Sequence, residues 1–313
     1  MSRLGKPSTA GPGEMDSLKR GAVKYAMPRE EERPALFAYC TRHLVGFISN
    51  TDTSFYGSGV IVAIHGAWAV ATAAHVATAL QTAGAAQMVF PGAQSSYGTW
   101  PAVEREYRPL CVLVSDARPG RTWRPDELDL AVIVPPPDAF TDVPGIGAID
   151  LALGAANPRV ATGGFCILGG FPERLQHPRA DRVFSTNIVS SHFIACPPQA
   201  RSGDIAINWT EVLQLPSGHL EDRPGAGGMS GGPVFLYSES VGSRVWTPRR
   251  QLPLAGILHY QAQPGGEYLL AHSSHALRDF ILANLNDPEQ IALREALAAS
   301  HREAIDEPPS NPA

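Results

Sequence analysis

Short apolar runs separated by turn-forming residues fill most of the chain between residues 44 and 271. Such runs are typical of β-strands, which are short and place successive side chains on opposite faces of a sheet. We expect strands over Leu44–Ser49, Tyr56–Ile64, Ala67–Ala73, Pro109–Val114, Asp129–Val134, Gly164–Gly170, Arg182–Ala195, Ile205–Leu215, Pro233–Tyr237, Leu254–Tyr260 and Glu267–Ala271. About a dozen short strands with frequent turns predict paired barrels or sandwiches.

Helical patterns are almost confined to the end of the chain. Residues Ser274–Leu285 and Pro288–Ala304 favour helices, and the Ala-rich segment after His75 predicts a short helical turn. Every other predicted element is a strand. We therefore expect an all-β fold with C-terminal helices.

Shifts in composition divide the chain into three parts. Residues 1–34 are rich in Gly, Pro and charge, which predicts a flexible N-terminal arm. Residues 35–287 hold the predicted strands, and the loop-like stretch 138–160 is expected to join two lobes. Residues 288–313 are expected to form a C-terminal helix and a disordered tail.

Composition and charge narrow the function classes. Hydrophobic residues make up 44% of the chain and charged residues 18%, so a packed core is expected and disorder is not. The net charge is −5 and no basic stripe is present, so we expect no nucleic-acid partner. No run of about 18 apolar residues occurs, so we expect no membrane span.

The cellular setting is inferred from the N-terminus and the cysteines. No apolar stretch follows the charges of Met1–Pro7, so no signal peptide is predicted. The four cysteines are widely spaced, without metal-type pairing, which predicts reduced buried thiols and no metal site. They are Cys40, Cys111, Cys166 and Cys196. A cytoplasmic location is the expectation that follows.

The candidate chemistry centres on a serine within a glycine cluster, Gly228–Pro233. A serine hydroxyl is a weak nucleophile and needs a base, usually a histidine, whose own orientation is fixed by a carboxylate. His75 and Asp129 each lie at the edge of an apolar run. The order His75, Asp129, Ser230 is one of the known orders for a base, its orienting group and a nucleophile.

Six segments, spread over about residues 40–285, together resemble the trypsin/chymotrypsin-type serine peptidases and occur in that family's order. They are Gly57–Val60, Thr72–His75, Asp129–Val132, Gly169–Pro172, Gly228–Pro233 and Gly256–Leu258. The resemblance is to the bacterial type of trypsin-like peptidase domain. It implies two six-stranded antiparallel β-barrels with the site between them.

The resemblance also implies roles for single residues. Ser230 would attack a peptide carbonyl, His75 would take its proton, and Asp129 would orient His75. The backbone amides of Gly228 and Ser230 would form the oxyanion hole. The expected activity is that of a serine endopeptidase that cleaves a polypeptide substrate through an acyl-enzyme, without a cofactor.

Two positions depart from the digestive members of this family. Met229 stands where an Asp would receive a freed N-terminus, so no zymogen switch of that kind is expected. Pro224 stands where a carboxylate would select Arg or Lys, so such specificity is not expected either. We expect the substrate pocket to involve Pro224, Leu258, His259, Tyr260 and Gly266. His259 and His272 leave recognition of an acidic side chain open, and a structural place near Asp129 or a surface position is the alternative for His259.

Several alternatives stay open at this point. Asp126 is the main rival of Asp129, with Glu127 behind it, although only Asp129 directly adjoins the apolar run. The segment around Ser230 also fits the nucleophile elbow of α/β-hydrolase esterases, with Asp279 and His301 as partners. A non-catalytic trypsin-like barrel that binds peptides is a third class. An active peptidase would be restrained by narrow specificity, a gated cleft or a regulatory protein partner.

Overall fold

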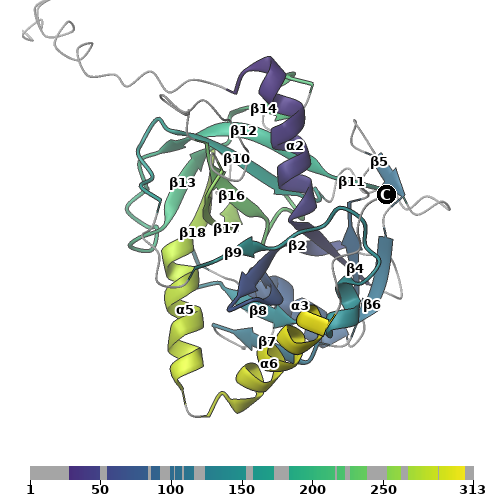
Figure 1. Cartoon of the computed structure of the whole chain (residues 1–313). Helices are drawn as coiled ribbons and strands as arrows, with labels where there is room; N and C mark the ends of the chain where they lie inside the picture. Colours follow the sequence, from purple (N-terminus) through teal and green to yellow (C-terminus); the bar gives the residue numbers. More distant parts are fainter. Residues whose placement is uncertain are drawn as a thin grey trace, which may run out of the picture.

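Two sheets of eight strands each form the framework of the protein (Figure 1). The computed structural model describes residues 28–49, 55–83, 86–91, 99–101, 103–107, 109–115, 124–152, 158–172, 183–215, 217–222, 226–237, 252–261, 267–287 and 289–306. In this part of the chain, no helix has both the length and the apolar composition that a membrane crossing requires.

The first sheet follows the order β6-β4-β1-β2-β3-β8-β7, and all neighbours on this path are antiparallel. The short strand β9 adds to β2 in parallel. The strands are β1 (Leu44–Ser49), β2 (Phe55–Ile64), β3 (Ala67–Thr72), β4 (Ala86–Phe90), β6 (Val103–Tyr107), β7 (Cys111–Val114), β8 (Ala131–Val134) and β9 (Ile149–Asp150). The expected six-stranded count is therefore exceeded, and one of the eight strands is parallel.

The second sheet closes on itself. Its strands pair in the ring β10-β16-β17-β18-β13-β12, and β12 returns to β10. Each neighbouring pair is antiparallel, and the hairpin β14-β15 extends from β12. The strands are β10 (Phe165–Gly170), β12 (Asn187–Ile194), β13 (Ile205–Asn208), β14 (Glu211–Leu215), β15 (Leu220–Asp222), β16 (Pro233–Leu236), β17 (Leu254–Gln261) and β18 (Tyr268–Ser273). This is the predicted six-stranded antiparallel barrel. A separate pair joins β5 (Thr99–Pro101) to β11 (Val183–Ser185).

Helices lie over both sheets, and two of them pack on the sheet that is more distant from them in sequence. Helix α2 (Arg33–Arg42) comes before the first sheet but packs on β10, β12 and β14 of the second. Helix α6 (Ile291–Asp306) comes after the second sheet but packs on β3, β7 and β8 of the first. Figure 1 shows these two helices over different sheets. Helix α3 (Ala74–Ala83) packs against the first sheet, and α5 (Ser274–Asn286) packs on β17 and β18.

One apolar cluster joins both sheets and both terminal helices. It contains Val60 of β2, Ile167 of β10, Leu36 of α2 and Leu293 of α6, all at most 1% exposed. Burial of such side chains is worth about 1.5–3 kcal/mol each. The two sheets therefore share a hydrophobic core rather than forming independent units.

The predicted all-β fold with C-terminal helices is confirmed, with differences at particular elements. Residues 28–34 of the expected arm are described, and they include a 3-10 helix (Glu30–Glu32) and the start of α2. Residues 1–27 of that arm and the tail 307–313 lie outside the described residues. The C-terminal helix is part of the core rather than an appendage, since Leu293 and Leu297 are buried.

Candidate active site

His75 and Asp129 lie against each other where β3 ends and β8 begins. His75 is the second residue of α3, and Asp129 lies two residues before β8. The ring Nδ1 of His75 lies 2.6 Å from Asp129 Oδ2, and the backbone N–H of His75 donates to Asp129 Oδ1 at 2.9 Å. Asp129 is fully buried, whereas the His75 side chain is 32% exposed. The carboxylate thus fixes the Nδ1 side of a partly exposed ring.

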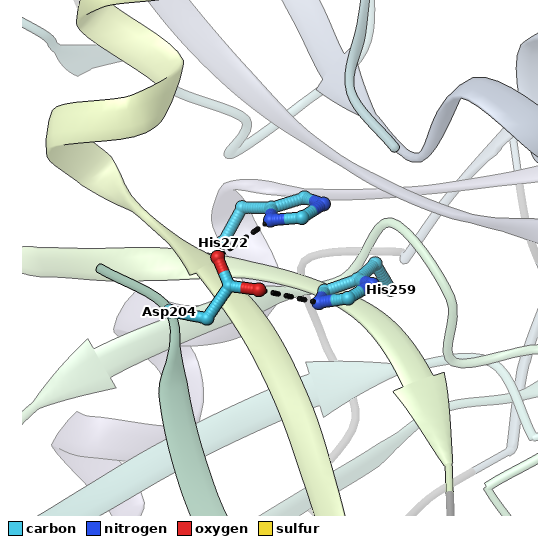
Figure 2. A group of neighbouring side chains, drawn as sticks. All are labelled: Asp204, His259 and His272. Carbon is cyan, nitrogen blue, oxygen red and sulfur yellow. Dashed lines mark hydrogen bonds and ion pairs between the residues drawn. The ribbon is translucent and has the colours of Figure 1, made fainter. Parts of the chain in front are cut away.

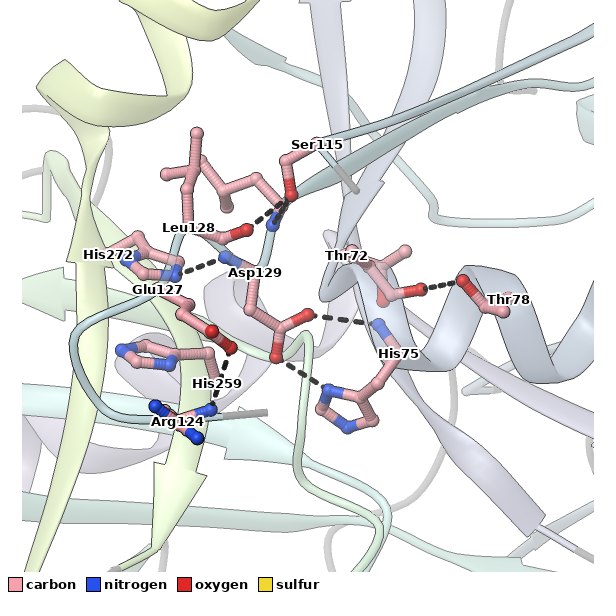
Figure 3. Close-up of polar contacts among 12 residues, drawn as sticks. Thr72, His75, Thr78, Ser115, Arg124, Glu127, Leu128, Asp129, His259 and His272 are labelled. Carbon is pink, nitrogen blue, oxygen red and sulfur yellow. Dashed lines mark hydrogen bonds and ion pairs between the residues drawn. The ribbon is translucent and has the colours of Figure 1, made fainter. Parts of the chain in front are cut away.

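Ser115 holds the backbone on both sides of Asp129 (Figure 3). Its hydroxyl donates to the Leu128 carbonyl at 2.5 Å and accepts from the Leu130 N–H at 3.1 Å. The Asp129 N–H donates to Nε2 of His272 at 2.9 Å. The backbone around Asp129 is therefore held by Ser115 and His272, while its carboxylate is held by His75.

The structure places Asp129, rather than its rivals, against His75. Glu127 accepts from the Arg124 N–H at 3.1 Å in an exposed turn. Among the described residues, no hydrogen bond or ion pair joins Asp126 to His75.

Ser230 stands on a tight turn before β16. The Met229 N–H donates to the Ala226 carbonyl at 3.0 Å, and Gly228 has φ of +82° at the third position of this turn. Glycine favours that conformation because it has no Cβ. Within the described part of the chain, the N–H groups of Gly228 and Ser230 donate no hydrogen bond. Ser230 itself is half-buried.

Ser58 of β2 ties the serine turn to the first sheet. Its N–H donates to the Ser230 carbonyl at 2.8 Å, and its hydroxyl donates to the Gly228 carbonyl at 2.8 Å. The same hydroxyl accepts from the Phe171 N–H at 2.9 Å, and Thr72 donates to the Ser58 carbonyl at 2.6 Å. Three residues of the second lobe are thereby held by one buried serine of the first.

The segments that contain Gly57, His75 and Ser230 meet where the serine turn contacts the first sheet. A Cβ on Gly57 would lie 2.5 Å from Val76 Cγ2 and 3.0 Å from the Ser230 carbonyl oxygen. Gly231 packs so closely on Ser58 and Thr72 that no side chain fits. The structure contains no hydrogen bond between the Ser230 hydroxyl and His75, although both residues are described. Such bonds are often longer in the absence of substrate.

Asp204, His259 and His272 form a buried cluster (Figure 2), and His272 joins it to the backbone of Asp129. His272 Nδ1 lies 2.8 Å from Asp204 Oδ1, and His259 Nε2 lies 3.4 Å from Asp204 Oδ2. The two imidazoles stack with centroids 3.7 Å apart and planes 6° apart. His259 lies at a bulge between Leu258 and Tyr260, where the pairing of β17 with β18 shifts. A bulge redirects side chains.

Burial and charge act on the pKa values of this cluster. Burial pushes the pKa of Asp204 upward, but hydrogen bonds and charge from His259 and His272 outweigh it, so the Asp204 pKa is lowered. Burial lowers the pKa of His259, and the Asp204 carboxylate opposes this only in part. The cluster thus favours an ionised Asp204 beside a neutral His259.

The cluster has the residue types of a metal site but not the orientation of one. The ligand atoms of Asp204, His259 and His272 lie within 4.8 Å of one another. An imidazole lone pair lies in the plane of its ring, so two parallel rings stacked face to face do not direct their lone pairs to one point. His272 Nε2 is also engaged by the Asp129 N–H. A metal would need at least one ring to turn.

The predicted pocket residues are only partly described. Pro224 and Gly266 lie outside the described residues, and Tyr260 is placed as part of β17. Leu258 is buried, and its backbone pairs with Gly231 and Gly232 of the serine turn. His259 is buried beside Asp204, so the surface position considered for it is wrong.

The α/β-hydrolase alternative is incompatible with the fold. Such an elbow requires a helix after the nucleophile, whereas Ser230 is followed by strand β16 of an antiparallel barrel. Asp279 lies on α5, 3.4 Å from His275, and His301 lies on α6.

Comparisons with known proteins give similarity in structure alone. No protein-family model matches the chain, and no curated protein does. Human heparin binding protein is 17% identical, with a TM-score of 0.49, over 85% of this chain and 96% of that one. Neuropsin, a serine protease expressed in the limbic system of mouse brain, is 14% identical, with a TM-score of 0.48, over 84% and 98%.

Proposed function

We propose that this protein is a serine endopeptidase in which Ser230 is the nucleophile, His75 the general base and Asp129 the group that orients His75. The observation that carries the proposal is the pair of contacts from one buried carboxylate to His75. Asp129 binds both the ring Nδ1 and the backbone N–H, at 2.6 and 2.9 Å. An imidazole held this way has its Nε2 available to accept a hydroxyl proton.

The serine turn supplies the complementary half of the site. Its glycines let the backbone fold around a half-buried hydroxyl, and the Gly228 and Ser230 amides have no acceptor among the described residues. Two such donors would stabilise the negative oxygen of a tetrahedral intermediate, and loss of one typically costs about 10²–10³ in turnover.

The reaction follows from these roles. Ser230 Oγ forms a bond to the peptide carbonyl carbon while His75 Nε2 takes the hydroxyl proton. His75 returns that proton to the leaving amine as the C–N bond breaks, which leaves an ester on Ser230. Water, activated by the same ring, then hydrolyses the ester and restores both groups. We further propose weak cleavage after Arg or Lys, because Pro224 offers no carboxylate.

A fluorophosphonate probe and a peptide library test this proposal. We expect the wild-type protein to be labelled at Ser230 and to cleave peptides, and Ser230→Ala and His75→Ala to do neither while unfolding at the wild-type temperature. An unchanged cleavage rate in Ser230→Ala would refute the proposal.

A peptide-binding barrel is the second candidate function, because no hydrogen bond joins the Ser230 hydroxyl to His75. That function predicts peptide binding by the wild-type protein without labelling or cleavage. Fluorescence anisotropy with the same library measures such binding directly.

A further inference from the structure

The polar contacts of the site continue past Asp129 into the second sheet. From the half-exposed ring of His75 they pass to Asp129, from the Asp129 N–H to His272, and from His272 to Asp204. His272 is on β18 and Asp204 directly precedes β13, so this path leaves the lobe that carries His75 (Figures 2 and 3).

The protonation of His272 follows from the direction of its hydrogen bonds. A backbone N–H can only donate, so the Nε2 atom that meets the Asp129 N–H at 2.9 Å must be the acceptor. The ring proton is then on Nδ1, where it is donated to Asp204 Oδ1 at 2.8 Å. Asp204 thus selects the tautomer of His272 whose Nε2 accepts the hydrogen bond from the Asp129 N–H.

His259 restricts the His272 ring. The two rings are nearly parallel at 3.7 Å, and the His259 ring lies 3.4 Å from the second oxygen of Asp204. Rotation of the His272 ring about its Cβ–Cγ bond would break the stack and both hydrogen bonds of the ring. All three side chains are at most 1% exposed, so no water replaces a lost partner without rearrangement.

We propose that His272 is a positioning residue for the His75–Asp129 pair, and that Asp204 and His259 hold it in the one orientation that accepts the Asp129 N–H. His272 acts through the backbone of Asp129, not through its carboxylate. With that acceptor removed, the Asp129 backbone shifts, and the carboxylate no longer meets both donors of His75. The inference rests on the proposed function only for its kinetic readout.

Two polar substitutions of His272 separate its two hydrogen bonds. The Gln side chain in His272→Gln reaches the place of Nε2 and supplies an oxygen to the Asp129 N–H. The shorter Asn side chain in His272→Asn reaches only the place of Nδ1, beside Asp204. We expect His272→Asn to lower kcat by about 10–100-fold with KM within about twofold, and His272→Gln to stay within about threefold of wild type. His275→Leu, which removes an exposed histidine of α5, is the matched control and leaves kcat unchanged.

A spectroscopic measurement tests the same inference without turnover. The proton between His75 Nδ1 and Asp129 Oδ2, in a 2.6 Å bond, gives a far-downfield proton resonance that His75→Ala identifies by its loss. We expect this resonance to move or broaden in His272→Asn and to persist in His272→Gln and His275→Leu. If the wild-type protein cleaves nothing, the proposed function fails while this experiment still decides the inference. Equal resonances in the Asn and Gln variants, with both folded, would overturn it.

Discussion

Asp129 is the residue at which the polar contacts of the candidate site converge. One carboxylate oxygen receives the ring of His75 and the other receives the first-turn N–H of α3. A carboxylate at a helix N-terminus is favoured by the unpaired amides there and by the helix dipole. Helix and ring are thereby fixed by the same group, so the position of His75 does not depend on its own side-chain torsions alone.

A different histidine couples stability to pH. His43 is buried, and its Nδ1 lies 2.5 Å from the Gly147 carbonyl oxygen. Burial lowers the pKa of His43 to about 4, from 6.5 for the unfolded chain. The unfolded state therefore binds the extra proton first, and the contribution of His43, full above pH 6.5, is lost as the pH falls from 6.5 through about 4.

The test is a comparison of the wild-type protein with His43→Asn, whose amide N–H takes the place of Nδ1 as a donor for the Gly147 carbonyl but cannot titrate. Below pH 4 the free energy of unfolding of the wild type should have fallen by about 3 kcal/mol more than that of the variant, relative to pH 7.5. Urea unfolding at intervals between these pH values measures both. Parallel curves would show that His43 does not carry this dependence.

At the scale of elements, the strands that could be predicted are those with continuous apolar runs. β1, β3, β8 and β17 were expected within a residue or two, because both faces of each are largely buried. The predicted strand over 205–215 is two strands, since Asn208 accepts from the Thr210 N–H at 2.8 Å in an Asx turn.

Other elements carry no such signal. β6 has the sequence Val-Glu-Arg-Glu-Tyr, and its alternation of charges conceals a strand at the edge of the sheet. Helix α2 follows a charged segment and contains a proline near its start, so composition suggested a flexible arm. Its Leu36 and Cys40 are nonetheless fully buried. The second sheet, on which α2 packs, is formed by residues far along the chain.

The residues of the candidate site also fall into those that the sequence predicts and those that it does not. His75, Asp129 and Ser230 stand in local motifs, and these could be recognised without a structure. Asp204 and His272 have no motif, because closure of the barrel brings β13 and β18 together. His259 was expected in the substrate pocket, and the bulge in β17 that accompanies its contact with Asp204 has no mark in the sequence. A buried polar cluster made by ring closure leaves no periodic pattern.

The turn around Ser230 is sensitive to an added side chain. Gly231 has φ of +85° and would meet the Ser58 carbonyl and the Thr72 hydroxyl with any Cβ. We expect Gly231→Ala to lower the free energy of unfolding by about 3 kcal/mol or more, from backbone strain plus displacement of the turn. Gly203→Ala is the control, because Gly203 has φ of +88° but no atom within 4 Å of an added Cβ.

Gly203→Ala should therefore lose only about 1 kcal/mol, the strain of the backbone alone. Chemical denaturation measures both variants under one condition. Equal losses would mean that contact with Ser58 and Thr72 does not constrain the serine turn.

At the scale of the whole molecule, each sheet is covered by a helix from the far end of the chain. α2 lies on the second sheet and α6 on the first, and one apolar cluster includes both helices and both sheets. Because His75 lies on a helix packed against the first sheet and Ser230 on a turn that leads into the second, the geometry of the site depends on this shared core. The sheets are expected to unfold together, in one transition.

Leu293→Ala on α6 tests this coupling. Leu293 is 1% exposed, so its truncation should cost about 2–5 kcal/mol. Ile291→Ala, on the same helix at 56% exposure, should cost little. Urea curves from tryptophan fluorescence and from fluorophosphonate labelling of Ser230 should shift together for Leu293→Ala. Separate midpoints would show that the lobes unfold independently.

Because α2 covers the second sheet and α6 covers the first, the site is completed late in synthesis of the chain. The first sheet leaves the ribosome long before α6, the helix that covers it, and both halves of the site precede that helix in the chain. We therefore expect Ser230 to gain the proposed reactivity only after α6 has been synthesised. Nascent chains stalled before residue 291 should remain unlabelled by the fluorophosphonate, while released chains react.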